Sequence, residues 1–218
     1  MSTRSFSPIV TIDAESPDSA AIDRAASIIA AGKPLIYPTR ALYGLGVDAF
    51  RPFAVDRVFD IKGRPKTNPV SVLIHRREAI EALVKHIPTA AVAIIDGLWP
   101  GGITLVFEAA DRVPANLTGG TGKIGIRLPQ HPVARALLTA VKTPITATSA
   151  NRSGEPGGHR IDQLPAAVIE QAAMVLNAGP LSGGPGSTVV DVTVDPPDIL
   201  RPGTVPADSI RAVVNGSA

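Results

Sequence analysis

Short strand-like and helix-like segments alternate along this chain, and single glycines or prolines separate most of them. The 20 Gly and 21 Pro are spread between the periodic segments, so they indicate many turns and not a low-complexity tract. Interleaved strands and helices with short connections are typical of an α/β domain. Several connections are too short for a helical crossover, which favours a mixed sheet over a wholly parallel one. We therefore predict a single α/β domain with one twisted, mostly mixed β-sheet flanked by helices.

The periodicity also places the individual elements. Helical spacing predicts one helix that begins near Pro17 and ends before Gly32, and further helices at 52–61, 77–84, 89–98, 132–141 and 162–173. Apolar, often β-branched runs predict strands at 35–37, 70–74, 103–108, 124–128, 144–148, 188–193 and 198–201. Residues 38–46 are predicted to form a loop. The resulting boundaries are an irregular lead-in at 1–13, the domain itself at 14–206, and a C-terminal tail at 207–218.

Composition excludes several kinds of chemistry. The 218 residues contain no cysteine, which rules out disulfides, a thiolate nucleophile and cysteine-ligated metals. The four histidines lack the spacing of metal ligands, so we expect no dedicated metal site. No apolar run is long enough to cross a membrane, and Met1–Phe6 lacks the apolar centre of a signal peptide. We therefore expect a cytoplasmic protein without a membrane partner.

The loop before the strand at 70–74 is strongly basic. Lys62, Arg64 and Lys66 follow one another with no acid between them, although the net charge of the whole chain is only +2. Such a loop is suited to meet an anion, while the plain alternative is a solvated surface turn. Polar residues of similar kinds lie at or near the ends of the predicted strands: Thr39, Arg40, Asn68, Ser149, Asn151, Ser187 and Arg201.

Cations together with hydroxyl and amide groups are suited to bind a triphosphate. Because ligands gather where strand ends converge in α/β sheets, these side chains are expected to line one cavity. The Walker A pattern is absent, so this is not a P-loop protein. Aromatic residues make up only 4% of the chain, which argues against stacking of bases on an aromatic platform.

Six segments between about residues 20 and 205 resemble the YrdC family in their order and spacing. They are Pro38-Thr39 with Tyr43-Gly-Leu-Gly46, Lys62-x-Arg64 with Asn68-Pro69, Trp99-Pro-Gly-Gly-Ile-Thr-Leu105, Gly125-Ile-Arg127-Leu-Pro129 with His131-Pro132, Thr148-Ser-Ala-Asn151-x-Ser-Gly154, and Ser187-Thr-Val-Val-Asp191 with Arg201-Pro-Gly203. The resemblance is to the short form of the family. It implies a YrdC-like fold with a basic concave ligand face.

Members of that family are threonylcarbamoyl-AMP synthases, a class of nucleotidyltransferase. The resemblance therefore implies that L-threonine, bicarbonate and ATP are converted to L-threonylcarbamoyladenylate and pyrophosphate. It also implies a downstream transferase complex that moves the threonylcarbamoyl group to an adenosine of tRNA. Mg²⁺ would be carried by ATP and not by protein ligands.

The resemblance also implies roles for individual residues. Lys62, Arg64, Ser149 and Asn151 would be catalytic, and together with Asn68 and Arg201 they would bind ATP. Thr39, Arg127 and Ser187 would bind threonine, with Arg127 at the carboxylate. Arg40 departs from the family pattern, since many relatives have an acid at that position.

Other interpretations stay open from the residues alone. Arg127 could belong to a structural ion pair, Ser149 and Asn151 could cap a turn, and His131 could cap a helix. A double-stranded RNA or tRNA binding module that uses the same basic face is the alternative function.

Overall fold

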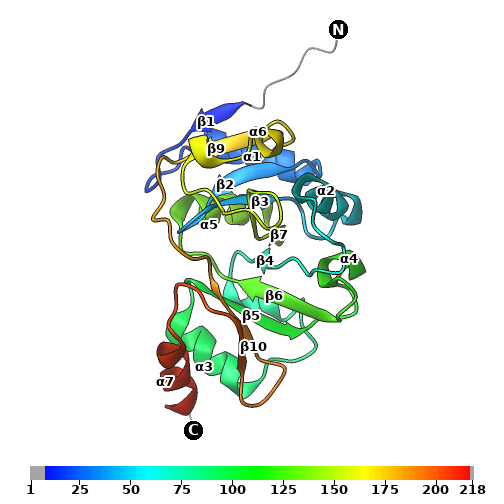
Figure 1. Cartoon of the computed structure of the whole chain (residues 1–218), viewed down its shortest axis with the longest axis vertical. Helices are drawn as coiled ribbons and strands as arrows, with labels where there is room; N and C mark the ends of the chain where they lie inside the picture. The colour runs from blue at the N-terminus through cyan, green and yellow to red at the C-terminus, as the bar shows by residue number, and fades with distance from the viewer. Residues whose placement is uncertain (1–7, 217–218) are drawn as a thin grey trace.

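The computed structural model describes residues 8–216, which form two mixed β-sheets with helices packed on them (Figure 1). Sheet A has the order β1-β9-β2-β3-β8, and sheet B has the order β11-β10-β5-β6-β4-β7. In sheet A the β1–β9 and β9–β2 pairs are parallel and the others antiparallel. In sheet B the β10–β5 and β4–β6 pairs are parallel. The predicted mixed pairing is confirmed.

The strands are short. Sheet A consists of β1 (Ile9–Thr11), β2 (Leu35–Pro38), β3 (Tyr43–Gly46), β8 (Thr148–Ser149) and β9 (Met174–Asn177). Sheet B consists of β4 (Val72–Leu73), β5 (Ile103–Glu108), β6 (Lys123–Arg127), β7 (Ile145–Thr146), β10 (Thr188–Asp191) and β11 (Asp198–Arg201).

One segment belongs to both sheets. Residues of β7 pair with β4 in sheet B, and after Ala147 the chain continues as β8, which pairs with β3 in sheet A. The hydroxyl of Tyr37 in β2 donates to the backbone oxygen of Thr146 over 3.0 Å and ties this segment to sheet A. The prediction of one sheet is therefore wrong, because the strand expected at 144–148 changes partners partway.

The helices begin and end at recognisable signals. They are α1 (Ser19–Ala30), α2 (Pro52–Lys62), α3 (Thr89–Leu98), α4 (Ala115–Thr118), α5 (Pro132–Val141), α6 (Ala166–Ile169) and α7 (Ala207–Asn215), with 3₁₀ turns η1 (Arg77–Ile80) and η2 (Ile161–Gln163). The Asp18 carboxylate caps α1 by accepting from the backbone N–H of Ala21 over 2.8 Å. The helix α2 begins at Pro52 and ends at Lys62, and the next residue, Gly63, caps it with a left-handed φ of 58°.

Two apolar clusters hold these elements together. One cluster packs α1 and α5 against β2 and β9, with Ile29 and Leu137 fully buried. The other cluster joins α2 and α3 to both sheets, with Phe59 and Phe107 at its centre. At the C-terminal end, α7 packs beside α3 at the foot of sheet B (Figure 1).

Several predictions at the ends and edges were wrong. The lead-in predicted at 1–13 contains β1, which pairs with β9, while residues 1–7 lie outside the described residues. The tail predicted at 207–218 is mostly α7, which packs on the core through Ile210, and residues 217–218 lie outside the described part.

Three internal segments also differ from the prediction. The loop predicted at 38–46 contains the strand β3, whose glycines lie beneath the ring of Tyr37. The helix predicted at 162–173 is reduced to the short η2 and α6, after which the unpredicted β9 begins. The helix predicted at 77–84 is only the 3₁₀ turn η1.

Candidate active site

A cavity of about 400 Å³ lies between the two sheets and brings together all the residues predicted for the site. They are Thr39, Lys62, Arg64, Asn68, Arg127, Ser149, Asn151, Ser187 and Arg201. Arg40 also lines the cavity and is its fifth cation. None of the described residues that line the cavity is Asp or Glu. The cavity is therefore built for an anionic ligand.

Lys62 lies at the C-terminal end of α2, where its side chain is buried. Its Nζ donates to the backbone oxygens of Ser149 and Asn151, each over 2.6 Å, and to Oδ1 of Asn151 over 3.3 Å. An ammonium group has three N–H donors, so protein acceptors use all of them. Burial, with a smaller contribution from the neighbouring Arg64, lowers the pKa of Lys62 to about 8.

Asn151 completes this corner of the cavity. Its Nδ2 donates to the backbone oxygens of Arg152 over 2.9 Å and Glu155 over 2.6 Å. Lys62 and Asn151 therefore hold the loop that follows β8 and fix where Ser149 lies. Direct contact of either side chain with a nucleotide stays a prediction.

Arg64 and Asn68 lie on the basic loop at the same side of the cavity. The Arg64 guanidinium donates from Nε to the backbone oxygen of Asn68 over 3.1 Å and from Nη2 to that of Pro69 over 2.8 Å. These bonds use two of its five N–H groups, so donors remain for a ligand. Burial and the charge of Arg201 lower the pKa of Arg64.

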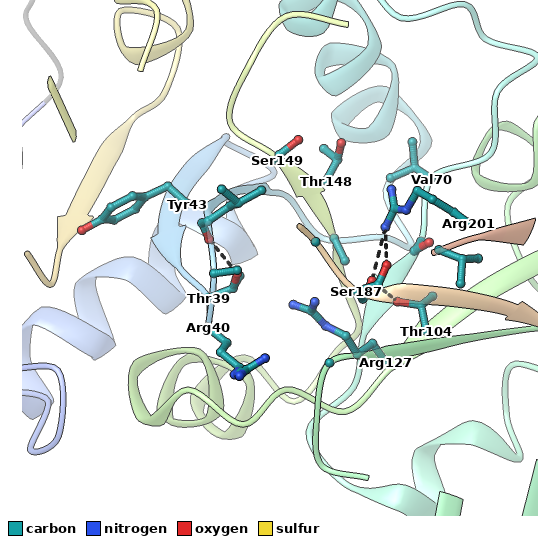
Figure 2. Close-up of a pocket in the computed structure, with 18 of the residues that line it drawn as sticks. Thr39, Arg40, Tyr43, Val70, Thr104, Arg127, Thr148, Ser149, Ser187 and Arg201 are labelled. Carbon is teal, nitrogen blue, oxygen red and sulfur yellow. Dashed lines mark hydrogen bonds between the residues drawn. The ribbon is translucent and has the colours of Figure 1, made fainter. Parts of the chain in front are cut away.

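Arg127 ends β6 and projects into the cavity from the floor formed by sheet B (Figure 2). Its Nε is buried and has no hydrogen-bond partner within residues 8–216. The structural ion pair considered from the sequence is wrong for the described residues, because their ion pairs do not include Arg127. Burial lowers the pKa of Arg127, partly opposed by Tyr37. This half-buried guanidinium has no ion-pair partner among the described residues, so it is suited to receive an anion.

Ser187 and Arg201 meet at the other end of the same floor. The Arg201 Nη2 donates to the backbone oxygen of Ser187 over 2.8 Å and, less closely, to its hydroxyl over 3.4 Å (Figure 2). The segment Arg201-Pro-Gly203 returns along the backbone of Ser187. An ideal Cβ on Gly203 would clash with the backbone nitrogen of Thr188, so any larger residue would push this segment away from the backbone at Ser187 and Thr188.

Thr104 is a site residue that the sequence reasoning missed. It lies on β5, lines the cavity, and its hydroxyl is 2.7 Å from that of Ser187. Its position as the only hydroxyl-bearing residue in the apolar run 103–107 is the signal that could have identified it.

The turn from β2 to β3 forms the remaining side of the cavity. The Thr39 hydroxyl donates to the backbone oxygen of Leu42 over 2.6 Å and closes the turn. Arg40 is exposed, and its backbone oxygen accepts from the Ser182 hydroxyl over 2.9 Å. The ring of Tyr43 points away from the other labelled residues (Figure 2), and its hydroxyl donates to the backbone oxygen of Gly179 over 2.7 Å.

Comparison with known proteins identifies the family. The Sua5/YciO/YrdC family model, whose description is telomere recombination, matches residues 27–203. The chain belongs to this family.

Two relatives and a solved structure show how far the similarity extends. The threonylcarbamoyl-AMP synthase of Pyrococcus abyssi is 37% identical over 87% of this chain and 56% of its own length. A protein of Mycobacterium tuberculosis, provisionally named as a threonylcarbamoyl-AMP synthase, is 37% identical over 95% of this chain and 96% of its own. The structure of P. abyssi Sua5 complexed with L-threonine has a TM-score of 0.88 and 36% identity, covering 94% of this chain and 60% of that one.

The resemblance inferred from the motifs is thus confirmed, as is the YrdC-like α/β fold. This family member spans little more than half of the P. abyssi relative and nearly all of the M. tuberculosis one. The basic concave face is a prediction that goes beyond the cavity lining described above.

Two features of the described residues concern metals and membranes. No group of three or more His, Cys, Asp or Glu within residues 8–216 is arranged to hold a metal ion. None of the helices in that range has the length and apolar character needed to span a bilayer.

Proposed function

We propose that this protein is a threonylcarbamoyl-AMP synthase, which converts L-threonine, bicarbonate and ATP to L-threonylcarbamoyladenylate and pyrophosphate. The observation that carries the proposal is that nine residues chosen from separate family motifs line one cavity. The names of the relatives at 37% identity support it.

The nucleotide half of the site would use the basic loop and the end of sheet B. Arg64 keeps donors free for phosphate oxygens, and Arg201 faces the same cavity. Asn68 and Ser149 line it without the internal bonds that occupy Asn151, so they are suited to orient the nucleotide. Lys62 would act mainly by holding Ser149 in position.

The threonine half would use Arg127, Ser187 and Thr39. The unpartnered Arg127 Nε is suited to bind the carboxylate of threonine. A carbamate oxygen on the threonine nitrogen would then attack the α-phosphorus as pyrophosphate leaves. The task of the protein is to position these groups and to neutralise their charge, which the five cations are suited to do.

Mg²⁺ fits this proposal only as an ion carried by the nucleotide. The described residues that line the cavity offer no carboxylate ligand, so phosphate oxygens and water would hold the ion. When bound, it would neutralise charge on the phosphates. The proposal also includes a cytoplasmic location and a downstream transferase complex that delivers the threonylcarbamoyl group to tRNA.

The test is pyrophosphate release from ATP by the purified protein, with threonine and bicarbonate added or omitted, and with serine as a competitor. Release that requires both co-substrates is the expected result. If pyrophosphate release does not depend on threonine, the proposal is wrong. Tight RNA binding that falls steeply with salt, without pyrophosphate release, would support the alternative of an RNA-binding module.

A further inference from the structure

The hydroxyls of Thr104 and Ser187 form a hydrogen bond with each other on the cavity floor. Thr104 is 3% exposed and Ser187 is 8% exposed, and their oxygens lie 2.7 Å apart (Figure 2). Thr104 lies on β5, and Ser187 immediately precedes the neighbouring parallel strand β10, whose register pairs Thr188 with Ile103 and Val189 with Thr104. A separation of 2.7 Å is typical of a hydroxyl–hydroxyl hydrogen bond, in which one oxygen donates and the other accepts.

The partners of each hydroxyl indicate which one donates. Within residues 8–216, Ser187 is the only hydrogen-bond partner of the Thr104 hydroxyl, so donation to Ser187 would satisfy the Thr104 proton inside the protein. The Ser187 oxygen also accepts, more weakly, from Arg201 Nη2, which can only donate. With two bonds accepted, the oxygen of Ser187 is saturated, and its own proton is left for a group inside the cavity.

We propose that Thr104 is a positioning residue that makes Ser187 a hydrogen-bond donor toward a carboxylate oxygen of bound L-threonine. The inference rests on the proposed function and deepens it, since it states that Ser187 donates to the ligand and that Thr104 orients the Ser187 hydroxyl. It explains why a threonine stands in the apolar strand Ile103–Glu108, on the face that carries the cavity floor. Arg127 and Ser187 then present donors only, which matches an anionic group and disfavours an amide.

The test measures L-threonine binding by calorimetry in four variants. Thr104→Val keeps the shape and removes the hydroxyl, and its Kd is expected to rise about tenfold, with the KM for ATP unchanged. Thr104→Ser restores the hydroxyl and is expected to bind within about twofold of the unchanged protein. Thr104→Ala is the second hydroxyl-free variant, for use if the valine variant does not fold. Thr139→Val removes an exposed hydroxyl on α5 as a matched control and is expected to have no effect.

A double variant separates positioning from general damage. If Thr104 acts through Ser187, then Thr104→Val combined with Ser187→Ala binds threonine no more weakly than Ser187→Ala alone. Additive losses, or unchanged affinity in Thr104→Val, would overturn the inference while leaving the proposed function intact. Absence of threonine binding and of threonine-dependent turnover in the unchanged protein would instead overturn the proposed function, and this inference with it.

Discussion

Lys62 and Arg127 line the same cavity but are in opposite states. The Lys62 ammonium gives all three of its donors to oxygens of Ser149 and Asn151. The Arg127 guanidinium keeps a buried Nε that no described residue accepts from. Both are cations in family motifs, and from the sequence both were predicted to bind a ligand. The contacts separate a cation that holds the protein together from one that is left for a ligand.

This difference teaches that charge in a cavity has two separate uses. A cation saturated by protein oxygens contributes to stability and shape, so its removal should first affect folding. A buried cation without a partner costs stability and contributes only when an anion arrives, so its removal should first affect binding. Variants at the two positions should therefore differ in the property that changes.

The largest expected effect is the loss of threonine binding in Arg127→Met. Its Kd for L-threonine is expected to rise about hundredfold, because a charge-assisted pair with the carboxylate is lost. Thermal stability should stay the same or rise, because a half-buried charge without an ion-pair partner among the described residues has been removed. Calorimetry and thermal unfolding measure the two quantities. A marked fall in Tm would show that Arg127 supports the fold and would erase the contrast with Lys62.

The second effect is a loss of stability in Lys62→Met. Removing the ammonium leaves oxygens of Ser149 and Asn151 without their donor, and the free energy of unfolding is expected to fall by about 2 kcal/mol. Urea unfolding measures it. Lys66→Met is the matched control, since Lys66 is exposed and forms a surface ion pair with Asp56. Equal stability in the two variants would argue against a structural role for Lys62.

The smallest expected effect is a loss of stability at low pH that arises at His131, four residues after Arg127. His131 follows β6 and caps α5, with its Nδ1 accepting from the backbone N–H of Val133 over 3.2 Å. Burial lowers the pKa of His131, with Glu15 partly opposing this. The unfolded chain therefore takes up the proton first, so this contribution is complete above about pH 6.5 and is lost as pH falls further.

Thermal unfolding between pH 7.5 and 5 measures that loss. The His131→Asn variant keeps a capping side chain that does not titrate, so its stability should fall less with acid, by about 1 kcal/mol at most. Identical pH profiles for the two proteins would contradict the role of His131. The pH profiles of these two proteins do not test the role of Lys62, whose ammonium group donates to Ser149 and Asn151.

The sequence predicted best where periodicity and end signals agree. The helices at 89–98 and 132–141 and the strand at 103–108 match the structure to the residue. The capping role considered for His131 is confirmed. In contrast, β3 was taken for a loop because its two glycines weaken any strand signal. They are there because an ideal Cβ on Gly46 would lie 2.6 Å from the ring of Tyr37, a tertiary contact that no local pattern reveals.

The sequence also predicted which residues line the cavity, but not which contacts each side chain makes there. All nine predicted site residues line the cavity. The internal use of the Lys62 and Asn151 donors depends on where the loop after β8 lies, which the motif spacing does not contain. Thr104 was missed for a similar reason, since its one sequence signal, a hydroxyl in an apolar run, does not show that Ser187 lies beside it.

The segment Ile145–Ser149, which passes from sheet B into sheet A, has a consequence for how the molecule admits ligands. Because one short stretch of backbone is paired into both sheets, moving the two cavity walls apart there would require breaking the β7–β4 or the β8–β3 pairing. We therefore expect ligands to enter and leave past turns that line the cavity, such as Thr39–Leu42. Among family members we therefore expect sequence changes that alter ligand preference to fall in those turns. The distance between the two sheets is expected to stay the same, because the shared segment fixes it.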